Sequence, residues 1–155
     1  MQLRARGDDA AALARLADAV AGLCRESGSA LLINSALPGA VGLARRLGAG
    51  LHLTARDLAT DAIPGAGELP LAASCHDARE LALAESRGVG FAVLGPVQPT
   101  RSHPQAAPMG WEGFARLRET CSLPIYALGG LAPSQLGQAR RHGAQGIAGI
   151  SGFQA

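Results

Sequence analysis

Short apolar segments alternate with amphipathic segments along nearly the whole of this 155-residue chain. Apolar runs that end at Gly or Pro, such as 91–94 and 124–128, have the length of buried strands. Segments between them, such as 77–87, repeat apolar residues at helical spacing and end at a glycine. Strict alternation of this kind predicts an α/β fold with a parallel sheet and right-handed crossovers. The candidates are therefore a doubly wound sheet and a (β/α)₈ TIM barrel.

The pattern predicts seven strands, at 2–4, 30–33, 50–53, 69–73, 91–94, 124–128 and 146–150. It predicts helices at 8–26, 38–47, 55–60, 77–87, 111–119 and 133–142. In the first helix, Asp8 or Asp9 is the expected N-cap. The buried stripe of that helix is expected to contain Leu13, Leu16, Val20 and Leu23.

Polar or turn-forming residues lie at or just past the end of nearly every expected strand: Arg4, Asn34, His52, Ser74, Pro96, Gly129 and Ser151. In a barrel these positions converge on one rim. A doubly wound nucleotide site would use a G-x-G-x-x-G turn, which does not follow the first strand. We therefore expect residues 1–155 to be one barrel domain. Seven strands are one fewer than eight, so we expect a truncated barrel without the first strand–helix unit and the last helix.

Charge and cysteine content exclude several classes of protein. All 14 basic residues are Arg, and the net charge of +2 is too small to argue for a nucleic-acid partner. Cys24, Cys75 and Cys121 are far apart, which predicts reduced core residues and neither a disulfide framework nor a zinc site. The polar start and the absence of a long apolar run indicate no signal peptide and no membrane span. We expect a cytoplasmic protein with no membrane or nucleic-acid partner.

Two loops at the ends of strands carry groups suited to an anionic small molecule. Segment 95–104 (GPVQPTRSHP) contains hydroxyls, a guanidinium and an imidazole, and segment 127–131 (ALGGL) offers backbone amides. Gly and Pro end each strand sharply and let the backbone come close to a ligand. Loops of this type at the carboxyl ends of strands are where α/β proteins bind small molecules.

Several motifs in the first half of the chain follow the pattern of one protein family. Segment 2–6 (QLRAR) resembles the family's Q-x-R-x-K strand, and 32–35 (LINS) resembles its I-N-D. Segment 48–53 followed by Asp57 resembles G-A-D-G-V-H-L-G-Q-x-D, and 74–76 (SCH) resembles S-x-H. Together these motifs resemble those of the thiamine phosphate synthase and thiazole tautomerase (TenI-like) family.

The second half continues the resemblance in the same order. Segments 95–96 and 99–102 resemble G-P-x-x-P-T-x-T-K, 128–131 resembles I-G-G-I, and 143–148 resembles G-A-D-G-V-A. Segments 74–77, 102–104, 110–112 and 126–130 are similar to a version of the domain that is fused behind a Nudix hydrolase. The resemblance implies a (β/α)₈ fold and leaves open a homodimer and a covalently linked Nudix domain; this chain contains no Nudix motif.

The resemblance implies phosphorylated small-molecule substrates. The family's synthases join a hydroxymethylpyrimidine diphosphate to a thiazole phosphate, and the protein stabilises the leaving diphosphate. By that analogy the catalytic cations are Arg4, Arg6 and His103, with Asn34 and Ser74 completing the clamp and Gln2 in the same strand as the arginines. The thiazole phosphate is expected at Gly130, Ile150 and Ser151, with Thr100 and Ser102 beside it. A structural ion pair for Arg4 and a purely structural turn at 129–130 are the alternatives.

This chain departs most from the family at the residues that hold magnesium in family members. Family members place two Asp residues there, and the resemblance assigns Asp57 to the second, whereas Ser35 stands where the first would be. Arg6 and His103 each replace a Lys. Mg²⁺ remains the expected cofactor, with one of its two carboxylates replaced.

Three hypotheses about function remain open. The chain is a synthase-like transferase of thiamine biosynthesis, a non-catalytic phosphate- or nucleotide-binding barrel attached to a Nudix hydrolase, or a thiazole tautomerase. The tautomerase would need a His where Pro96 stands. His52 and His76 are each expected to be either core residues or ligands. His142 is expected to stabilise a helix end and Trp111 to pack a loop.

Overall fold

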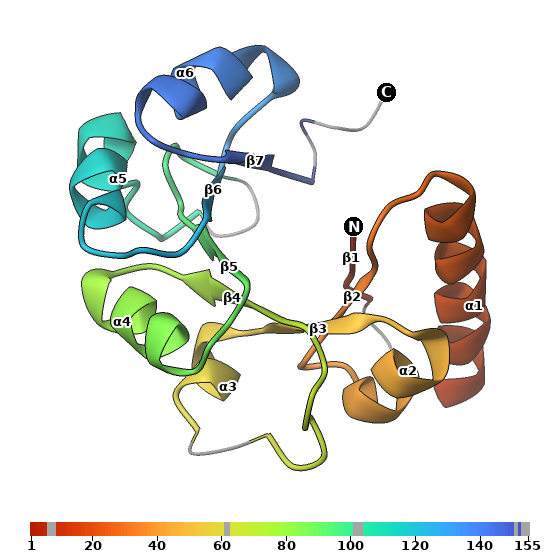
Figure 1. Cartoon of the computed structure of the whole chain (residues 1–155). Coiled ribbons are helices and arrows are strands. Elements are labelled where there is room, and N and C mark those ends of the chain that lie inside the picture. The colour runs from red at the N-terminus through yellow and green to blue at the C-terminus, as the bar shows by residue number, and fades with distance from the viewer. Residues whose placement is uncertain (6–8, 61–62, 101–103, 151, 153–155) are drawn as a thin grey trace. The chain divides into compact units, whose positions relative to one another are not determined.

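Helices and strands alternate along the chain in the computed structural model, which describes residues 1–5, 9–60, 63–100, 104–150 and 152 (Figure 1). In that part of the chain the strands are β1 (Gln2–Leu3), β2 (Leu32–Asn34), β3 (Gly50–Leu53), β4 (Leu71–Cys75), β5 (Phe91–Leu94), β6 (Ile125–Leu128) and β7 (Gly146–Ala148). The α-helices are α1 (Ala10–Glu26), α2 (Ala40–Leu47), α3 (Ala55–Leu58), α4 (Ala78–Ser86), α5 (Gly110–Arg118) and α6 (Leu136–Arg141), the last preceded by the 3₁₀ turn η1 (Pro133–Gln135). The chain divides into two compact units, Met1–Ala72 and Ala73–Ala155.

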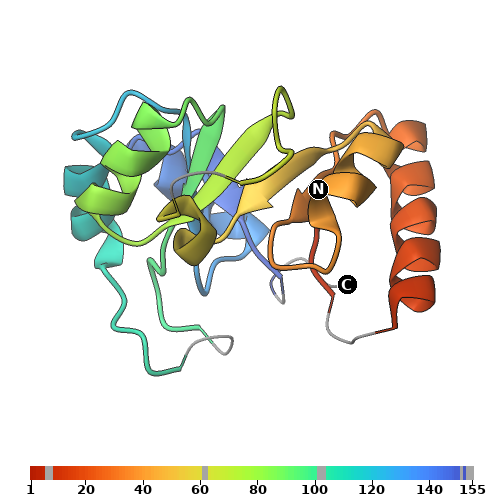
Figure 2. The same cartoon turned by 90° about the horizontal axis from the view of Figure 1, so that it is seen from below.

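The first unit is a parallel sheet covered by helices. Strands β1, β2 and β3 neighbour one another in the order of the sequence, and Asn34 at the end of β2 pairs with His52 of β3. Helix α2 packs against β2 and β3 and also contacts α1 (Figures 1 and 2). All four residues of β3 are buried, as expected for a strand covered on both faces. The register places the polar residues that follow β2 and β3 at the same edge.

Helix α1 buries a different face from the one that the sequence predicted. Asp9 is the N-cap, and its Oδ1 accepts the Ala11 and Ala12 N–H groups at 2.9 and 3.1 Å. The expected stripe is wrong in part, since Leu16 is 44% exposed and Leu23 is 60% exposed. The buried positions are Leu13, Ala17, Ala21 and Cys24. Three of these four residues are small, and all four share one helical face, so the larger leucines of the hydrophobic pattern do not mark the buried face.

The second unit repeats the parallel arrangement. Strands β5, β6 and β7 are parallel neighbours in sequence order, with Val93 opposite Tyr126. Phe114 of α5 is fully buried, and the rings of Phe91 and Tyr126 meet edge to face at 5.2 Å. Cys75 and Cys121 are free and buried, as is Cys24 in the first unit, which confirms the prediction for the cysteines. Burial, with smaller contributions from Glu80, Cys121 and Asp77, raises the pKa of Cys75 to about 12.

Element ends shift by one or two residues from the expected ones. Strand β4 runs to Cys75 and β7 ends at Ala148, whereas β3 and β5 have the expected bounds. Within the described part of the chain, no helix has both the length and the apolar character needed to cross a membrane.

Candidate functional site

Three side chains form a closed hydrogen-bonded cluster in the first unit, which we call the Ser35–Thr54–Asp57 cluster. Ser35 Oγ donates to Asp57 Oδ2 at 2.5 Å, and Thr54 Oγ1 donates to the same oxygen at 2.8 Å. The Thr54 N–H donates to Ser35 Oγ at 3.0 Å, and the Asp57 N–H donates to Thr54 Oγ1 at 3.1 Å. The carboxylate therefore holds both hydroxyls, and each hydroxyl also accepts a backbone N–H.

The local fold explains why these residues meet. Ser35 follows β2 and Thr54 follows β3, and the Ser35 N–H donates to the His52 carbonyl at 2.9 Å, extending the strand pairing by one step. Thr54 is also the N-cap of α3, which places Asp57 in its first turn. The cluster is thus built at the carboxyl ends of two neighbouring parallel strands, where α/β proteins carry their sites.

Asn34 and His52 lie beneath this edge and are almost fully buried. Asn34 is 7% exposed, and its Oδ1 accepts the Ala36 N–H at 3.0 Å to close a turn. His52 is 4% exposed, and burial lowers its pKa to about 4. Its imidazole is therefore neutral at pH 7. Of the two readings of His52, the structure favours the core residue.

In the second unit, the loop after β5 runs alongside the loop after β6. The Val97 N–H donates to the Leu128 carbonyl at 2.8 Å, and the Gln98 N–H donates to the Gly129 carbonyl at 3.1 Å. The Gly95–Pro96 peptide bond is cis. The Met109 N–H returns to the Pro96 carbonyl at 2.9 Å and ties the far end of the loop to its beginning. Figure 2 shows the described part of this segment extending away from β5 and α5.

Gly129 and Gly130 make this close approach possible. Both have positive φ, 104° and 67°, which L side chains rarely adopt. A Cβ on Gly129 would lie 2.6 Å from the Pro96 Cβ, and one on Gly130 would meet the Pro99 carbonyl oxygen. Gly130 is exposed, whereas Gly129 is buried. The pair is therefore a tight turn that presents backbone at the surface, which is compatible with both readings of this segment.

At the end of β4, His76 pairs with a glutamate on the next helix. His76 Nδ1 lies 2.9 Å from Glu80 Oε2, and the His76 N–H donates to the same oxygen at 2.7 Å. The Asp77 carboxylate caps α4 by accepting the Glu80 N–H at 2.8 Å. His76 is exposed, so it is not the core residue that was one of the two alternatives. Ser74, two residues earlier, is half-buried.

The other expected site residues are Gln2, Arg4, Thr100 and Ile150, which the structure describes, and four that lie outside the described residues. Gln2 and Arg4 are exposed, and neither ion pair formed between described residues includes Arg4. Ile150 is 58% exposed, and Thr100 is half-buried. Arg6, Ser102, His103 and Ser151 lie outside the described residues. The described residues therefore include Arg4 of the expected clamp, and Thr100 and Ile150 of the expected phosphate site.

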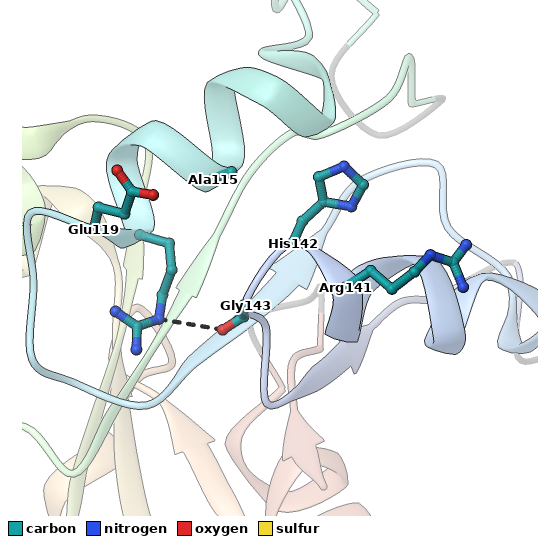
Figure 3. A pocket seen from close by; sticks show the side chains of 6 residues that line it. Ala115, Glu119, Arg141, His142 and Gly143 are labelled. Atoms are coloured by element: carbon teal, nitrogen blue, oxygen red, sulfur yellow. Dashed lines mark hydrogen bonds between the residues drawn. The ribbon is translucent and has the colours of Figure 1, made fainter.

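A hollow of about 380 Å³ lies between α5 and α6, and the six described residues that line it include none of the predicted site residues (Figure 3). Arg118 beside it is engaged, since its Nε donates to the Gly143 carbonyl at 3.2 Å and its Nη1 to the Cys121 carbonyl at 3.0 Å. His142 stacks on Trp111 at 5.2 Å, and its Nδ1 lies 2.8 Å from the Gln138 carbonyl. Trp111 thus packs α5 against α6, and His142 ends a helix as expected.

Comparison with known proteins sets these features in context. The family described as thiamine monophosphate synthase (TMP-TENI) matches residues 1–153. The chain belongs to this family. The thiamine-phosphate synthase of Methanospirillum hungatei is 32% identical to it over 154 residues, which are 97% of this chain and 73% of that protein. The putative thiamine-phosphate synthase 2 of Aquifex aeolicus is 39% identical over 80 residues.

A comparison with solved structures concerns the fold alone. The thiamine phosphate pyrophosphorylase of Pyrococcus furiosus has a TM-score of 0.77 and 22% identity, with 96% of this chain and 70% of that chain covered. That likeness shows the α/β fold with its parallel strands. The match to the Aquifex relative covers 52% of this chain and 43% of that protein.

Two residues of the site were missed by sequence reasoning. Thr54 holds Asp57 and caps α3, and its spacing of three residues before an Asp is a capping pattern that the sequence shows. Glu80 holds His76, and their i, i+4 spacing across a helix start is a weaker signal. Among the described residues, no three His, Cys, Asp or Glu side chains group closely enough to hold a metal ion.

Proposed function

We propose that this chain carries the site of a thiamine-phosphate synthase, a transferase of thiamine biosynthesis. In the reaction, the bond between the pyrimidine methylene carbon and the diphosphate oxygen breaks, and diphosphate leaves with the electron pair. The thiazole ring nitrogen supplies the electron pair of the new carbon–nitrogen bond. The protein has to stabilise the departing negative charge and shield the cationic carbon, so positioning and electrostatics dominate over acid–base work.

The observation that carries the proposal is the pair of loops after β5 and β6. Their backbones run side by side, and the two glycines at positive φ leave no side chain over the exposed backbone of Gly130. Backbone N–H groups at the carboxyl ends of late strands suit a phosphate monoester. Membership of the synthase family indicates which phosphate it would be. We place the thiazole phosphate at Gly130, Ile150 and Ser151, with Thr100 and Ser102 beside it.

We assign the diphosphate to polar groups that lie on or after other strands. Arg4, Arg6 and His103 supply positive charge in this proposal, and Gln2 and Ser74 supply neutral donors. Asn34 would contribute its Nδ2 group, because its Oδ1 already accepts the Ala36 N–H. Arginine offers a planar fork of donors that matches phosphate oxygens.

The fold, the location and the assembly of the protein follow from the same family relationship. The seven strands would belong to the (β/α)₈ barrel that the sequence predicted, and the family relationship together with the likeness to the Pyrococcus protein supports this. Free buried cysteines suit a reducing compartment, which supports a cytoplasmic location. A homodimer and a linked Nudix domain remain proposals for the protein in the cell.

Formation of thiamine phosphate from the two phosphorylated precursors, followed by mass spectrometry, tests the proposal. We expect product with the wild-type chain and a loss of about tenfold or more in Gly130→Ala, whose added Cβ meets the Pro99 carbonyl. Gly42→Ala on α2, where nothing lies within 4 Å of the added carbon, is the matched control and should keep full activity.

The other outcomes identify the alternative functions. Binding of the thiazole phosphate by a folded chain without product would overturn the synthase and favour a non-catalytic binding domain. Isomerisation of a thiazole substrate without the pyrimidine would favour a tautomerase. Pro96 has no titratable group at the position where that enzyme needs a His, so we expect no isomerisation.

A further inference from the structure

Every hydroxyl of the Ser35–Thr54–Asp57 cluster both donates and accepts. A hydroxyl has one proton to donate, and both protons point to Asp57 Oδ2, at 2.5 and 2.8 Å. Each hydroxyl oxygen also receives a backbone N–H, from Thr54 and from Asp57 itself. The two hydroxyls and Asp57 Oδ2 are thus satisfied within the protein, and hydrogen bonds to a carboxylate belong to the stronger class.

This set of donors does not fit the magnesium position that the family implies. Mg²⁺ prefers anionic oxygens in near-octahedral geometry, and the cluster offers one carboxylate where the resemblance implies two. A cation at Asp57 Oδ2 would have to displace the two hydroxyl protons that Oδ2 already accepts. Those protons offset part of the negative charge of the carboxylate. Ser35 is neutral and cannot replace the missing carboxylate. The described residues also contain no group of three potential ligands.

We propose that the Ser35–Thr54–Asp57 cluster is a metal-free replacement for the family's two-carboxylate position, so that the site does not take up a divalent cation there. The two hydroxyls fix the position of the Asp57 carboxylate, as a bound cation would. They also connect the end of β2 to the start of α3. The proposal rests on the proposed function only for the identity of the anion, which would then be bound by protein groups alone.

Binding of Mn²⁺ alone, followed by the electron paramagnetic resonance signal of the free ion, tests the proposal without any substrate. We expect no saturable site in the wild-type chain and one site per chain in Ser35→Asp, which restores the second carboxylate. Combining Ser35→Asp with Asp57→Asn should abolish that site. Ser35→Asn is the matched control, because it adds similar bulk without charge and should bind no Mn²⁺.

One Mn²⁺ bound per wild-type chain and lost in Asp57→Asn would overturn the proposal. A folded Ser35→Asp chain that binds no Mn²⁺ would also contradict the proposal, because the serine would then not be the reason that the wild-type chain binds no divalent cation. If Ser35→Asp does not fold, titration of the wild type with inorganic diphosphate decides. We expect equal affinity in EDTA and in Mg²⁺, and a gain of about tenfold with Mg²⁺ that is absent in Asp57→Asn would overturn it. These readouts do not require turnover, so a chain without synthase activity would leave the metal result intact.

Discussion

The two site regions are organised in different ways. The Ser35–Thr54–Asp57 cluster of the first unit is held by side chains, which gather three polar groups around one carboxylate oxygen. The paired loops of the second unit are held by backbone, through hydrogen bonds from Val97 and Gln98 to the loop after β6 and through glycines that leave space for them. A side-chain arrangement can change its chemistry by one substitution, whereas a backbone arrangement cannot lose its glycines without losing its shape.

The largest expected effect is at the backbone region. Gly129→Val would place a branched side chain at a φ of 104° and against Pro96, and we expect it to destabilise the fold by about 3 kcal/mol or more. Chemical denaturation measures this. Gly42→Ala on α2 should instead be neutral or raise stability by up to about 1 kcal/mol. Equal effects of the two changes would show that the loops tolerate a side chain.

The next effect concerns pH and the first unit. Burial lowers the pKa of His52 to about 4, against 6.5 when unfolded, so only the unfolded chain takes up a proton between these values. Stability contributed by neutral His52 is complete above pH 6.5 and should fall by about 3 kcal/mol as the pH drops towards 4. Urea denaturation across this range measures it. His52→Leu should remove most of the slope, and an unchanged slope would contradict burial as its cause.

A smaller effect is expected at the cluster itself. Asp57→Ala leaves the Ser35 and Thr54 hydroxyls without their acceptor, and we expect a loss of about 1–3 kcal/mol. Asp57→Asn retains a neutral acceptor and should cost less. Thermal unfolding of the two variants beside the wild type checks the order. A larger loss of stability in Asp57→Asn than in Asp57→Ala would mean that the carboxylate does not hold the hydroxyls.

The smallest effect is expected where side chains meet in water. Arg46 Nη1 and Asp18 Oδ1 lie 2.6 Å apart between α2 and α1, but the two side chains are 48% and 53% exposed. Water and salt screen such a pair, so Arg46→Ala should change stability by less than about 1 kcal/mol. Denaturation at low and high salt checks this. A loss as large as that of Asp57→Ala would remove the distinction between enclosed and exposed polar contacts.

The sequence predicted the elements well because strand and helix signals are local. Strands β3 and β5 have the expected bounds, and Asp9, one of the two expected N-caps, caps α1. Asp77 caps α4, although it was expected as the first residue of that helix. The buried face of α1 was predicted wrongly in part, because packing at Ala17 and Ala21 depends on how closely the helix approaches its neighbours. That distance is a tertiary property and leaves no mark in the hydrophobic pattern.

The sequence identified which residues belong to the candidate site, but it did not predict the hydrogen bonds between them. Family motifs identified Ser35 and Asp57 as matching positions, yet only the register of β2 against β3 brings the serine hydroxyl onto the aspartate. Likewise, the glycine pair at 129–130 could be recognised in the sequence, but its partner Pro96 could not, because the two segments are far apart along the chain. Contacts between distant loops depend on pairing that one sequence does not reveal.

The central claim is that this chain supports synthase chemistry, and simultaneous measurement of diphosphate release and thiamine phosphate formation tests it most directly. The account predicts equal amounts of the two products, formed only when both precursors are present, and formed in EDTA as well as in Mg²⁺. Diphosphate release without thiamine phosphate, or no release from a folded chain that binds both precursors, would contradict it.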